Sequence, residues 1–262
     1  MVSSVGIIGF GNMGGALGEG ISARFPEVRL TVMEKIQEKQ ETARKIGAVI
    51  ADSFKEMFSA ADIIIIAVKP KDLDRFCAEA SSYSENCRII SVAAGKPISY
   101  FQDKLHTRQV IRFMPNLSAK VQASAVAAAV PEETDEDFRT DALALAGAVG
   151  TPYELPEYLL AAFTGLSGSG IAYVFSFIHA LALGGTHAGI PYPKSLSISL
   201  DTLDGAVKLL RETGEHPAAA LSRVISPSGT TIEGIKALES AGFTAAVMEA
   251  VKAGADKAQK ME

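Results

Sequence analysis

The sequence predicts an α/β protein in which an N-terminal domain with a doubly wound parallel sheet is followed by an all-α C-terminal domain. Two observations predict this. Short runs of β-branched residues alternate with helical segments in the first half, and such runs almost vanish beyond residue 156. Strands that alternate with helices through short connections form a parallel sheet covered on both faces. We place the two domains at residues 1–155 and 156–262.

The strands of the first domain are predicted from apolar runs between helices. Asp62 to Val68 is the clearest, because its continuous isoleucines without alternation indicate a strand buried on both faces. The other predicted strands are 5–9, 28–33, 48–51, 88–93, 109–113 and 123–130. Helices are predicted at 13–24, 37–46 and 53–60.

The second domain is predicted to contain only helices, near 156–164, 168–189, 193–213, 217–225, 229–240 and 243–260. The stretch from Ile171 to Leu183 is apolar all round, so it must be buried on every side. It is shorter than the roughly 20 apolar residues that cross a bilayer. We expect it at a subunit interface, because obligate dimers have such apolar cores. A core helix within one chain is the alternative.

Composition excludes several classes of protein. The chain is 48% hydrophobic and 21% charged, as globular proteins are, and its net charge of -5 without a basic run argues against nucleic-acid binding. The N-terminus lacks the basic segment of a signal peptide, and Cys77 and Cys87 are too few for a disulfide framework. We therefore expect a cytoplasmic protein with no membrane partner. The 4 histidines show no ligand spacing and predict no metal site.

A glycine fingerprint follows the first predicted strand and precedes the first predicted helix. The segment Gly9-Phe10-Gly11-Asn12-Met13-Gly14 matches G-x-G-x-x-G. Its glycines permit a tight turn and a close approach to a pyrophosphate, which the helix N-terminus attracts. The first domain is therefore predicted to be a Rossmann domain that binds NADPH or NADH. Its predicted cofactor ligands here are Gly9, Gly11, Asn12, Met13 and Gly14. A glycine-rich packing turn without a ligand is the alternative.

Glu34 closes the second predicted strand about 20 residues beyond Gly14. A carboxylate at this position accepts hydrogen bonds from the adenosine ribose and repels a 2'-phosphate, which favours NADH. Lys35 follows directly and could pair with that phosphate instead. Both residues are candidate cofactor ligands, and the choice between the two cofactors stays open.

Three further segments end predicted strands at the carboxyl edge of the sheet, where doubly wound sheets bind ligands. They are Ala67-Val68-Lys69-Pro70, Ala93-Ala94-Gly95 and Met114-Pro115-Asn116. Small residues let a cofactor approach closely, so the first two segments and Asn116 are candidate cofactor ligands. Lys69 is otherwise a solvated loop lysine, and Asn116 is otherwise a turn residue.

Two segments rich in small and hydroxyl residues stand out in the second half. Ser226 to Gly234 leads into a predicted helix, and its free backbone N–H groups and hydroxyls can hold a carboxylate without an arginine. A capping box that merely starts a helix is the alternative. Thr164 to Gly170 is predicted to be a turn at the domain junction, which could admit a nicotinamide ring or serve only as a linker.

With these residues the chain resembles the pyrroline-5-carboxylate reductase family. The resemblance covers nearly the whole length and is most specific at Thr164 to Gly170 and Ser226 to Thr231. It implies NAD(P)H-dependent reduction of 1-pyrroline-5-carboxylate to L-proline, the last step of proline biosynthesis. It also implies a dimer interlocked through the helical domain, and decamers built from such dimers. By the same resemblance the substrate carboxylate is held by Ser226, Ser228, Gly229, Thr230 and Thr231. Thr231 is the predicted catalytic residue, beside the imine.

The chain departs from the family pattern at several positions. Ser228 stands where glycine is usual and adds a side chain inside the carboxylate turn. Ile171 replaces a proline, Phe54 replaces an asparagine near the adenosine, and Leu117-Ser118 replaces Thr-Pro. Glu34 replaces a neutral residue of many NADPH-preferring members. These differences leave a related cyclic imine open as the substrate.

Imine reduction requires few catalytic side chains, because a protonated imine is already electrophilic. The protein must hold the nicotinamide about 3 to 3.5 Å from the imine carbon. Thr231 is expected to position the imine nitrogen, whose proton comes from water. A hydroxyacid dehydrogenase would need a general base, usually a lysine, and the helix after Gly170 has none before Lys194. A non-catalytic nucleotide sensor is the other alternative, and it would not need the Ser226 turn.

Overall fold

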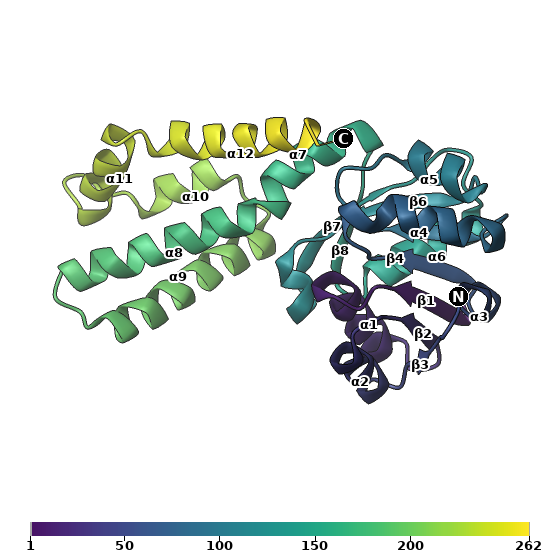
Figure 1. Ribbon diagram of the computed structural model, residues 1–262. Coiled ribbons are helices and arrows are strands. Elements are labelled where there is room, and N and C mark those ends of the chain that lie inside the picture. Colours follow the sequence, from purple (N-terminus) through teal and green to yellow (C-terminus); the bar gives the residue numbers. More distant parts are fainter. Residues whose placement is uncertain (1, 262) are drawn as a thin grey trace. The chain divides into compact units, whose positions relative to one another are not determined.

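The computed structural model describes residues 2–261. The chain forms two compact units, Met1–Ser169 with Ala253–Glu262, and Gly170–Lys252. The first unit is a doubly wound α/β domain and the second is entirely helical, so the predicted fold class is confirmed (Figure 1). The compact units divide after Ser169, and the domain boundary placed after residue 155 stays a prediction.

The first unit is built on one eight-stranded sheet with the strand order β3-β2-β1-β4-β5-β6-β7-β8. Its strands are β1 Ser4–Ile8, β2 Arg29–Met33, β3 Val49–Ile50, β4 Ile63–Ile66, β5 Arg88–Ser91, β6 Val110–Met114, β7 Ser124–Ala129 and β8 Gly150–Glu154. β1 to β6 are parallel, β7 is antiparallel to β6, and β8 is parallel to β7. The strand order reverses between β1 and β4. Doubly wound sheets bind their ligands at the carboxyl ends of such a strand pair.

Helices cover both faces of this sheet, as Figure 1 shows. They are α1 Asn12–Arg24, α2 Gln37–Lys45, α3 Phe54–Ala60, α4 Leu73–Ala80, α5 Ile98–Leu105 and α6 Glu136–Ala146. In β4, Ile63 and Ile65 pack with α1, α2 and α6, whereas Ile64 and Ile66 pack with α3, α4 and α5. Because successive side chains of a strand point to opposite faces, a run of four isoleucines fills both cores at once.

Several elements of the first unit were not predicted from the sequence. The edge strand β8 contains Gly150 and Pro152 and is largely exposed, so it has no apolar run. α4, α5 and α6 are short helices whose single apolar face is less conspicuous than the buried strands between them. The predicted third strand, 48–51, shrinks to Val49–Ile50.

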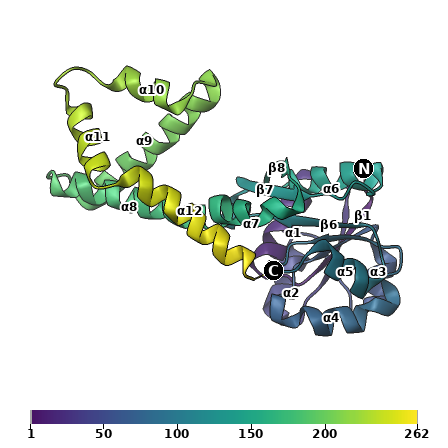
Figure 2. The same cartoon turned by 90° about the horizontal axis from the view of Figure 1, so that it is seen from above.

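The second unit consists of helices that bury little of their surface. Its helices are α8 Gly170–His187, α9 Tyr192–Thr213, α10 Pro217–Val224 and α11 Thr230–Ser240, and α12 Phe243–Gln259 runs on into the first unit. α8 packs along α9, while α10, α11 and α12 follow as separate helices (Figure 2). In the described chain, α10, α11 and α12 bury no residue, and α8 buries only Gly170 and Ala182. This unit has no core of its own.

The expectation that Ile171 to Leu183 could be a core helix of one chain is wrong. Phe175 is 54% exposed and Leu183 is 50% exposed. The helical run to which they belong, Glu157–His187, has 31 residues and a mean hydropathy of 1.5. By length and composition alone it could cross a bilayer, which the shorter stretch seen in the sequence could not. A second subunit that covers this surface explains the same composition, as predicted for an obligate dimer.

The segment predicted as a turn at the domain junction is helical, which corrects that prediction. Residues Thr164–Gly168 form a π-helical turn between α7, Leu160–Phe163, and α8. The Ser169 N–H donates to the Thr164 carbonyl oxygen at 2.8 Å, five residues back, as in a π-helix. The glycines therefore do not open a loop here. They widen the helix by one residue, a feature frequent at functional sites.

Candidate active site

The glycine loop joins β1 to α1 at the carboxyl edge of the sheet. Gly9 has a φ of 91°, and a β-carbon there would lie 2.8 Å from the Ala67 carbonyl oxygen. A β-carbon on Gly14 would collide with the Gly9 carbonyl oxygen. These two glycines therefore let the loop pack against the end of β4. A β-carbon on Gly11 would meet only Lys39 Nζ, 3.9 Å away, so the loop is open on that side.

The first turn of α1 offers unused hydrogen-bond donors. The backbone N–H groups of Asn12, Met13 and Gly14 have no acceptor within the described residues. Gly11 caps the helix without a side-chain bond, and the first turn carries no acidic residue. An anion placed here would gain both the free donors and the positive end of the helix dipole. The loop therefore fits a dinucleotide pyrophosphate.

Glu34 follows β2 and ties two loops together. Its Oε2 accepts a hydrogen bond from the Phe10 N–H at 2.7 Å, and its Oε1 accepts from the N–H groups of Lys35 at 2.8 Å and Ile36 at 3.0 Å. The Glu34 carboxylate thus lies directly beside the glycine loop. A carboxylate has about four acceptor positions, so one remains for a ribose hydroxyl.

The two lysines near this loop differ in where their ammonium groups lie. Lys35 is exposed, and its side chain has no partner within the described residues. Lys39, in the first turn of α2, is half-buried and extends toward Gly11. Sequence reasoning missed Lys39. Its position follows from the tilt of helical side chains toward the helix N-terminus, which directs a first-turn lysine of α2 toward the carboxyl edge of the sheet, where the glycine loop lies.

The end of β4 lies against the glycine loop, as predicted for the Ala67-Val68-Lys69-Pro70 segment. The Ala67 N–H donates to the Ile8 carbonyl oxygen at 2.9 Å. Val68 is half-buried, while Lys69 and Pro70 are exposed and lead into a short 3-10 turn. Ala67 is thus a packing partner of the loop, and its role as a cofactor ligand stays a prediction.

The Ala93-Ala94-Gly95 segment follows β5 and meets the C-terminal end of the chain. Ala93 is buried and its N–H donates to Ser91 Oγ at 3.3 Å. Gly95 has a φ of 75°, and a β-carbon there would lie 2.8 Å from the Met261 carbonyl oxygen. Only glycine fits this position, because its backbone is left-handed and another backbone approaches it closely.

Asn116 is engaged in structural hydrogen bonds on all sides. Its Oδ1 accepts from the Ser118 N–H at 2.9 Å, and its Nδ2 donates to Ser167 Oγ at 3.0 Å. Its backbone N–H donates to Ser124 Oγ at 2.9 Å. These bonds connect the end of β6 to β7 and to the π-helical turn. They fit the turn-residue interpretation, and a cofactor contact for Asn116 stays a prediction.

An ion pair between a buried arginine and a half-buried glutamate lies near this edge. Arg112 of β6 is 1% exposed, and its Nη1 lies 2.7 Å from Glu157 Oε1. The same oxygen accepts a hydrogen bond from the Ile98 N–H at 2.7 Å, at the start of α5. The pair therefore connects the sheet, α5 and the beginning of the long helical run.

The carboxylate turn lies in the second unit and runs from Ser226 into α11. Gly229 is the N-cap of α11 and has no side-chain cap bond, so the capping-box alternative is not formed. A β-carbon on Gly229 would collide with Ser226 Oγ, which places that hydroxyl beside the helix N-terminus. Ser228 and Thr230 are exposed and Thr231 is half-buried. Ser228 has a φ of 59°, the left-handed conformation that glycine adopts without strain.

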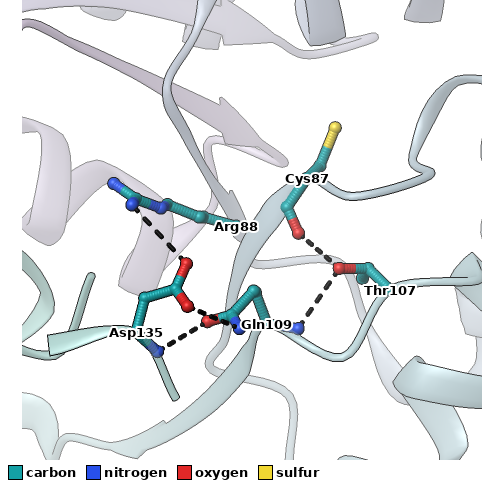
Figure 3. A network of polar contacts seen from close by, with 5 residues as sticks. All are labelled: Cys87, Arg88, Thr107, Gln109 and Asp135. Atoms are coloured by element: carbon teal, nitrogen blue, oxygen red, sulfur yellow. Dashed lines mark hydrogen bonds and ion pairs between the residues drawn. The ribbon is translucent and has the colours of Figure 1, made fainter. Parts of the chain in front are cut away.

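A second polar cluster lies at the opposite, amino edge of the sheet (Figure 3). Thr107 Oγ1 donates to the Cys87 carbonyl oxygen at 2.7 Å, and Gln109 and Asp135 exchange hydrogen bonds at 3.1 and 3.3 Å. Arg88 pairs with Asp135 at 3.7 Å. A cavity of about 720 Å³ opens beside these residues. It is remote from the glycine loop, because it lies where β5 and β6 begin.

Neither cysteine has the environment of a reactive thiol. Burial raises the pKa of the Cys77 thiol and also that of Cys87. Both are free thiols in the described structure, and a raised pKa keeps a thiol protonated and unreactive. Within residues 2–261, no group of three His, Cys, Asp or Glu side chains is placed to hold a metal ion.

The fold and the open glycine loop define an NAD(P)H-dependent oxidoreductase, and comparison with known proteins identifies its family. The profile described as "Pyrroline-5-carboxylate reductase dimerisation" matches residues 157–261, and that described as "NADP oxidoreductase coenzyme F420-dependent" matches residues 4–95. The pyrroline-5-carboxylate reductase of Aquifex aeolicus is 39% identical over 98% of this chain and 97% of its own.

Solved structures of pyrroline-5-carboxylate reductases are also similar to this chain. The pyrroline-5-carboxylate reductase of Coxiella burnetii is 26% identical over 99% of this chain and 98% of its own, with a TM-score of 0.93. The pyrroline carboxylate reductase of Plasmodium falciparum, solved with NADP bound, is 25% identical over 98% and 97%, with a TM-score of 0.86. The chain belongs to the pyrroline-5-carboxylate reductase family, and its helical domain is a self-association domain.

Proposed function

We propose that this protein reduces 1-pyrroline-5-carboxylate to L-proline with NAD(P)H, the last step of proline biosynthesis. The observation that carries the proposal is the combination, in one chain of this family, of an open glycine loop and a hydroxyl-rich turn at a helix N-terminus. The loop suits a dinucleotide pyrophosphate, and the turn suits the carboxylate of a cyclic imino acid.

The cofactor is held by the Rossmann domain, and when bound it supplies the hydride. Gly11, Asn12 and Met13 present backbone N–H groups to its pyrophosphate, and Glu34 meets the adenosine ribose. Ala67 to Pro70, Ala93 to Gly95 and Asn116 line the remainder of the cofactor's path at the carboxyl edge. The small residues among them, Ala67 and Ala93 to Gly95, permit close approach, as the packing of Ala67 against the glycine loop illustrates.

The substrate carboxylate is held by the turn of residues 226–231. Ser226 places its hydroxyl beside the N-terminus of α11, where the N–H groups of Thr230 and Thr231 have no cap. Thr231, half-buried in the first turn, positions the imine nitrogen. Water delivers the proton to that nitrogen, because no lysine or histidine belongs to the turn.

The protein functions as a dimer whose subunits cover each other's α8, and such dimers assemble into a decamer in the cytoplasm. The exposed apolar side chains of α8 and the absence of buried residues from α10 to α12 in the described chain support the dimer. The helices α10 to α12, which follow the run Glu157–His187, also expose many charged residues, and this favours a protein partner over a bilayer for the run.

The first test is the rate at which purified protein oxidises NADH and NADPH with pyrroline-5-carboxylate. Turnover establishes the reductase activity, and the ratio of the two rates gives the cofactor preference. Absence of turnover with both cofactors would refute the proposal.

Ser228 favours one second candidate substrate, a related cyclic imine carboxylate, because the Ser228 side chain lies in the carboxylate turn. The six-membered homologue tested in the same assay distinguishes the two substrates. Saturable cofactor binding without turnover of any cyclic imine would indicate a nucleotide sensor.

A further inference from the structure

The side chain of Lys39 lies over the one open glycine of the fingerprint. Its Nζ is 3.9 Å from the position that a β-carbon on Gly11 would occupy, and no other atom comes within 4 Å of that position. A β-carbon on Gly9 or on Gly14 would instead meet backbone oxygen atoms. Gly11 is the glycine of the fingerprint at which the backbone approaches a pyrophosphate. An ammonium group thus stands at the position where the cofactor phosphates pass.

The charge of Lys39 is not neutralised by the protein. No carboxylate lies within ion-pair distance of its Nζ in the described chain, although Glu34 and Glu38 are near in sequence. Glu34 directs both of its oxygens to the N–H groups of Phe10, Lys35 and Ile36. The donors of the first turn of α1 are also unused. A half-buried cation and free N–H groups therefore face one side of the loop.

Lys39 and Lys35 are not equivalent candidates. Lys35 lies in the exposed connection between β2 and α2. Lys39 is on α2, whose first turn is fixed by bonds from the N–H groups of Lys39 and Gln40 to the Ile36 carbonyl oxygen, at 3.0 and 3.1 Å. The helix fixes the direction of the Lys39 side chain and lowers the entropy lost when its ammonium group binds an anion.

We propose that Lys39 binds a phosphate of the nicotinamide cofactor, with the diphosphate beside Gly11 as its partner. The 2'-phosphate of NADPH offers the same chemistry and is the second source that the experiment distinguishes. The inference rests on the proposed function, because it assigns a residue to the same cofactor site. It makes Lys39, and not Lys35, the cation of that site.

The test compares Lys39→Met with Lys35→Met, which removes the neighbouring exposed ammonium group from the same full-length protein. Methionine keeps an unbranched apolar chain, so α2 should be preserved, and circular dichroism verifies this. Affinities for NADH and NADPH are measured by the fluorescence change of the reduced nicotinamide. We expect Lys39→Met to weaken binding about 5- to 50-fold and Lys35→Met by less than about 2-fold. Lys39→Arg should restore most of the affinity.

Two readouts separate a phosphate contact from a general structural effect. ADP-ribose should lose affinity for Lys39→Met, whereas adenosine, which has no phosphate, should not. Equal losses for NADH and NADPH assign the contact to the diphosphate, and a loss confined to NADPH assigns it to the 2'-phosphate. Unchanged binding of both dinucleotides, or an equal loss of adenosine affinity, would overturn the inference.

The outcome for Lys39 can be read separately from that for the proposed function. Wild-type protein that binds dinucleotides but reduces no pyrroline-5-carboxylate would refute the reductase proposal, while the binding comparison still decides on Lys39. Turnover by the wild type together with unchanged binding in Lys39→Met would refute only the phosphate contact. Wild-type protein that binds neither dinucleotide would overturn both.

Discussion

The Glu34 carboxylate accepts a hydrogen bond from the backbone N–H of Phe10 at 2.7 Å, so the acid at the end of β2 holds the glycine loop itself. Its second oxygen takes the N–H groups of Lys35 and Ile36. Backbone donors of a β2–α2 connection are suitable partners for an anion such as a 2'-phosphate. In this protein the Glu34 carboxylate already accepts hydrogen bonds from these donors. A 2'-phosphate would therefore lose these donors and would also be repelled by the negative charge of Glu34.

The first prediction concerns the cofactor preference that follows from this arrangement. We expect a lower KM for NADH than for NADPH in the wild type. Glu34→Gln keeps an acceptor oxygen but removes the charge, so the preference for NADH should fall about 10-fold, equivalent to roughly 1.4 kcal/mol. Steady-state kinetics with both cofactors measure this ratio. A wild-type preference for NADPH would contradict the role given to Glu34.

The fold was largely predictable because its strongest signals are local. The four isoleucines of β4 and the glycines that follow β1 fix the sheet and its loop. β8 could not be predicted in this way, because an edge strand with one glycine and one proline has no apolar pattern. The π-helical turn at Thr164 was also missed, since its glycines and serines are equally typical of a loop.

The candidate site was predictable in position but not in its contacts. Glu34 was placed at the end of the second strand by spacing alone. Its engagement with Phe10 depends on a side-chain rotamer that no sequence pattern specifies. Lys39 was missed because its distance from Gly11 in the chain is bridged only when β2 and α2 are assembled. The exposure of Phe175 on α8 likewise depends on what covers the helix in the oligomer.

A second prediction tests Thr231 as the residue beside the imine. Thr231→Ala removes a hydroxyl whose hydrogen bond is worth about 1 to 3 kcal/mol, so kcat/KM for pyrroline-5-carboxylate should fall roughly 5- to 150-fold. The affinity for NADH should stay unchanged, because the change lies in the carboxylate turn. Thr231→Ser keeps the hydroxyl and should retain most of the activity. Equal kinetics for Thr231→Ala and the wild type would exclude a direct role.

A third prediction concerns the strained serine of the same turn. Ser228 has a φ of 59°, a conformation that costs a non-glycine residue about 1 kcal/mol. Ser228→Gly should therefore raise the free energy of unfolding by about 1 kcal/mol, seen as a melting temperature higher by about 2 to 4 °C. Ser228→Ala keeps the β-carbon and should gain no stability. A change in KM shared by both variants would show that the hydroxyl contacts the substrate.

A fourth prediction addresses the ion pair between Arg112 and Glu157. Glu157→Ala removes the carboxylate that lies 2.7 Å from Nη1 of Arg112, whose side chain is 1% exposed. Arg112 then loses one of its partners and the Ile98 N–H loses its acceptor, so the free energy of unfolding should fall by about 1 to 3 kcal/mol, which urea unfolding at matched protein concentration measures. Glu157→Gln retains an acceptor for the Ile98 N–H and should cost less. A loss below about 1 kcal/mol in Glu157→Ala would show that other groups already compensate Arg112.

The last prediction is a dependence of stability on pH that originates at Asp62. Its Oδ2 accepts hydrogen bonds from the N–H and the hydroxyl of both Ser3 and Ser4, at 2.8 to 3.2 Å. Burial acts to raise the pKa of Asp62, but these bonds together outweigh it, so its pKa lies below the ordinary value of 3.8. A carboxyl whose pKa is lower in the folded state stabilises the fold above its unfolded pKa. That contribution is lost as the pH falls through the folded pKa.

Asp62→Asn should therefore lower the free energy of unfolding at pH 6 by about 1 kcal/mol, a modest value because the carboxylate is largely exposed. The difference between variant and wild type should shrink as the pH falls below 3.8, because the Asp62 carboxyl of the unfolded chain takes up its proton there and that of the folded protein does so only at lower pH. Thermal unfolding of both proteins from pH 3 to pH 7 measures this difference in stability. Asp52→Asn serves as a control, because the Asp52 side chain has no hydrogen-bond partner in the described chain. A difference that is constant over this pH range would mean that the substitution destabilises the fold through altered packing or hydrogen-bond geometry. The charge of Asp62 would then contribute nothing to stability.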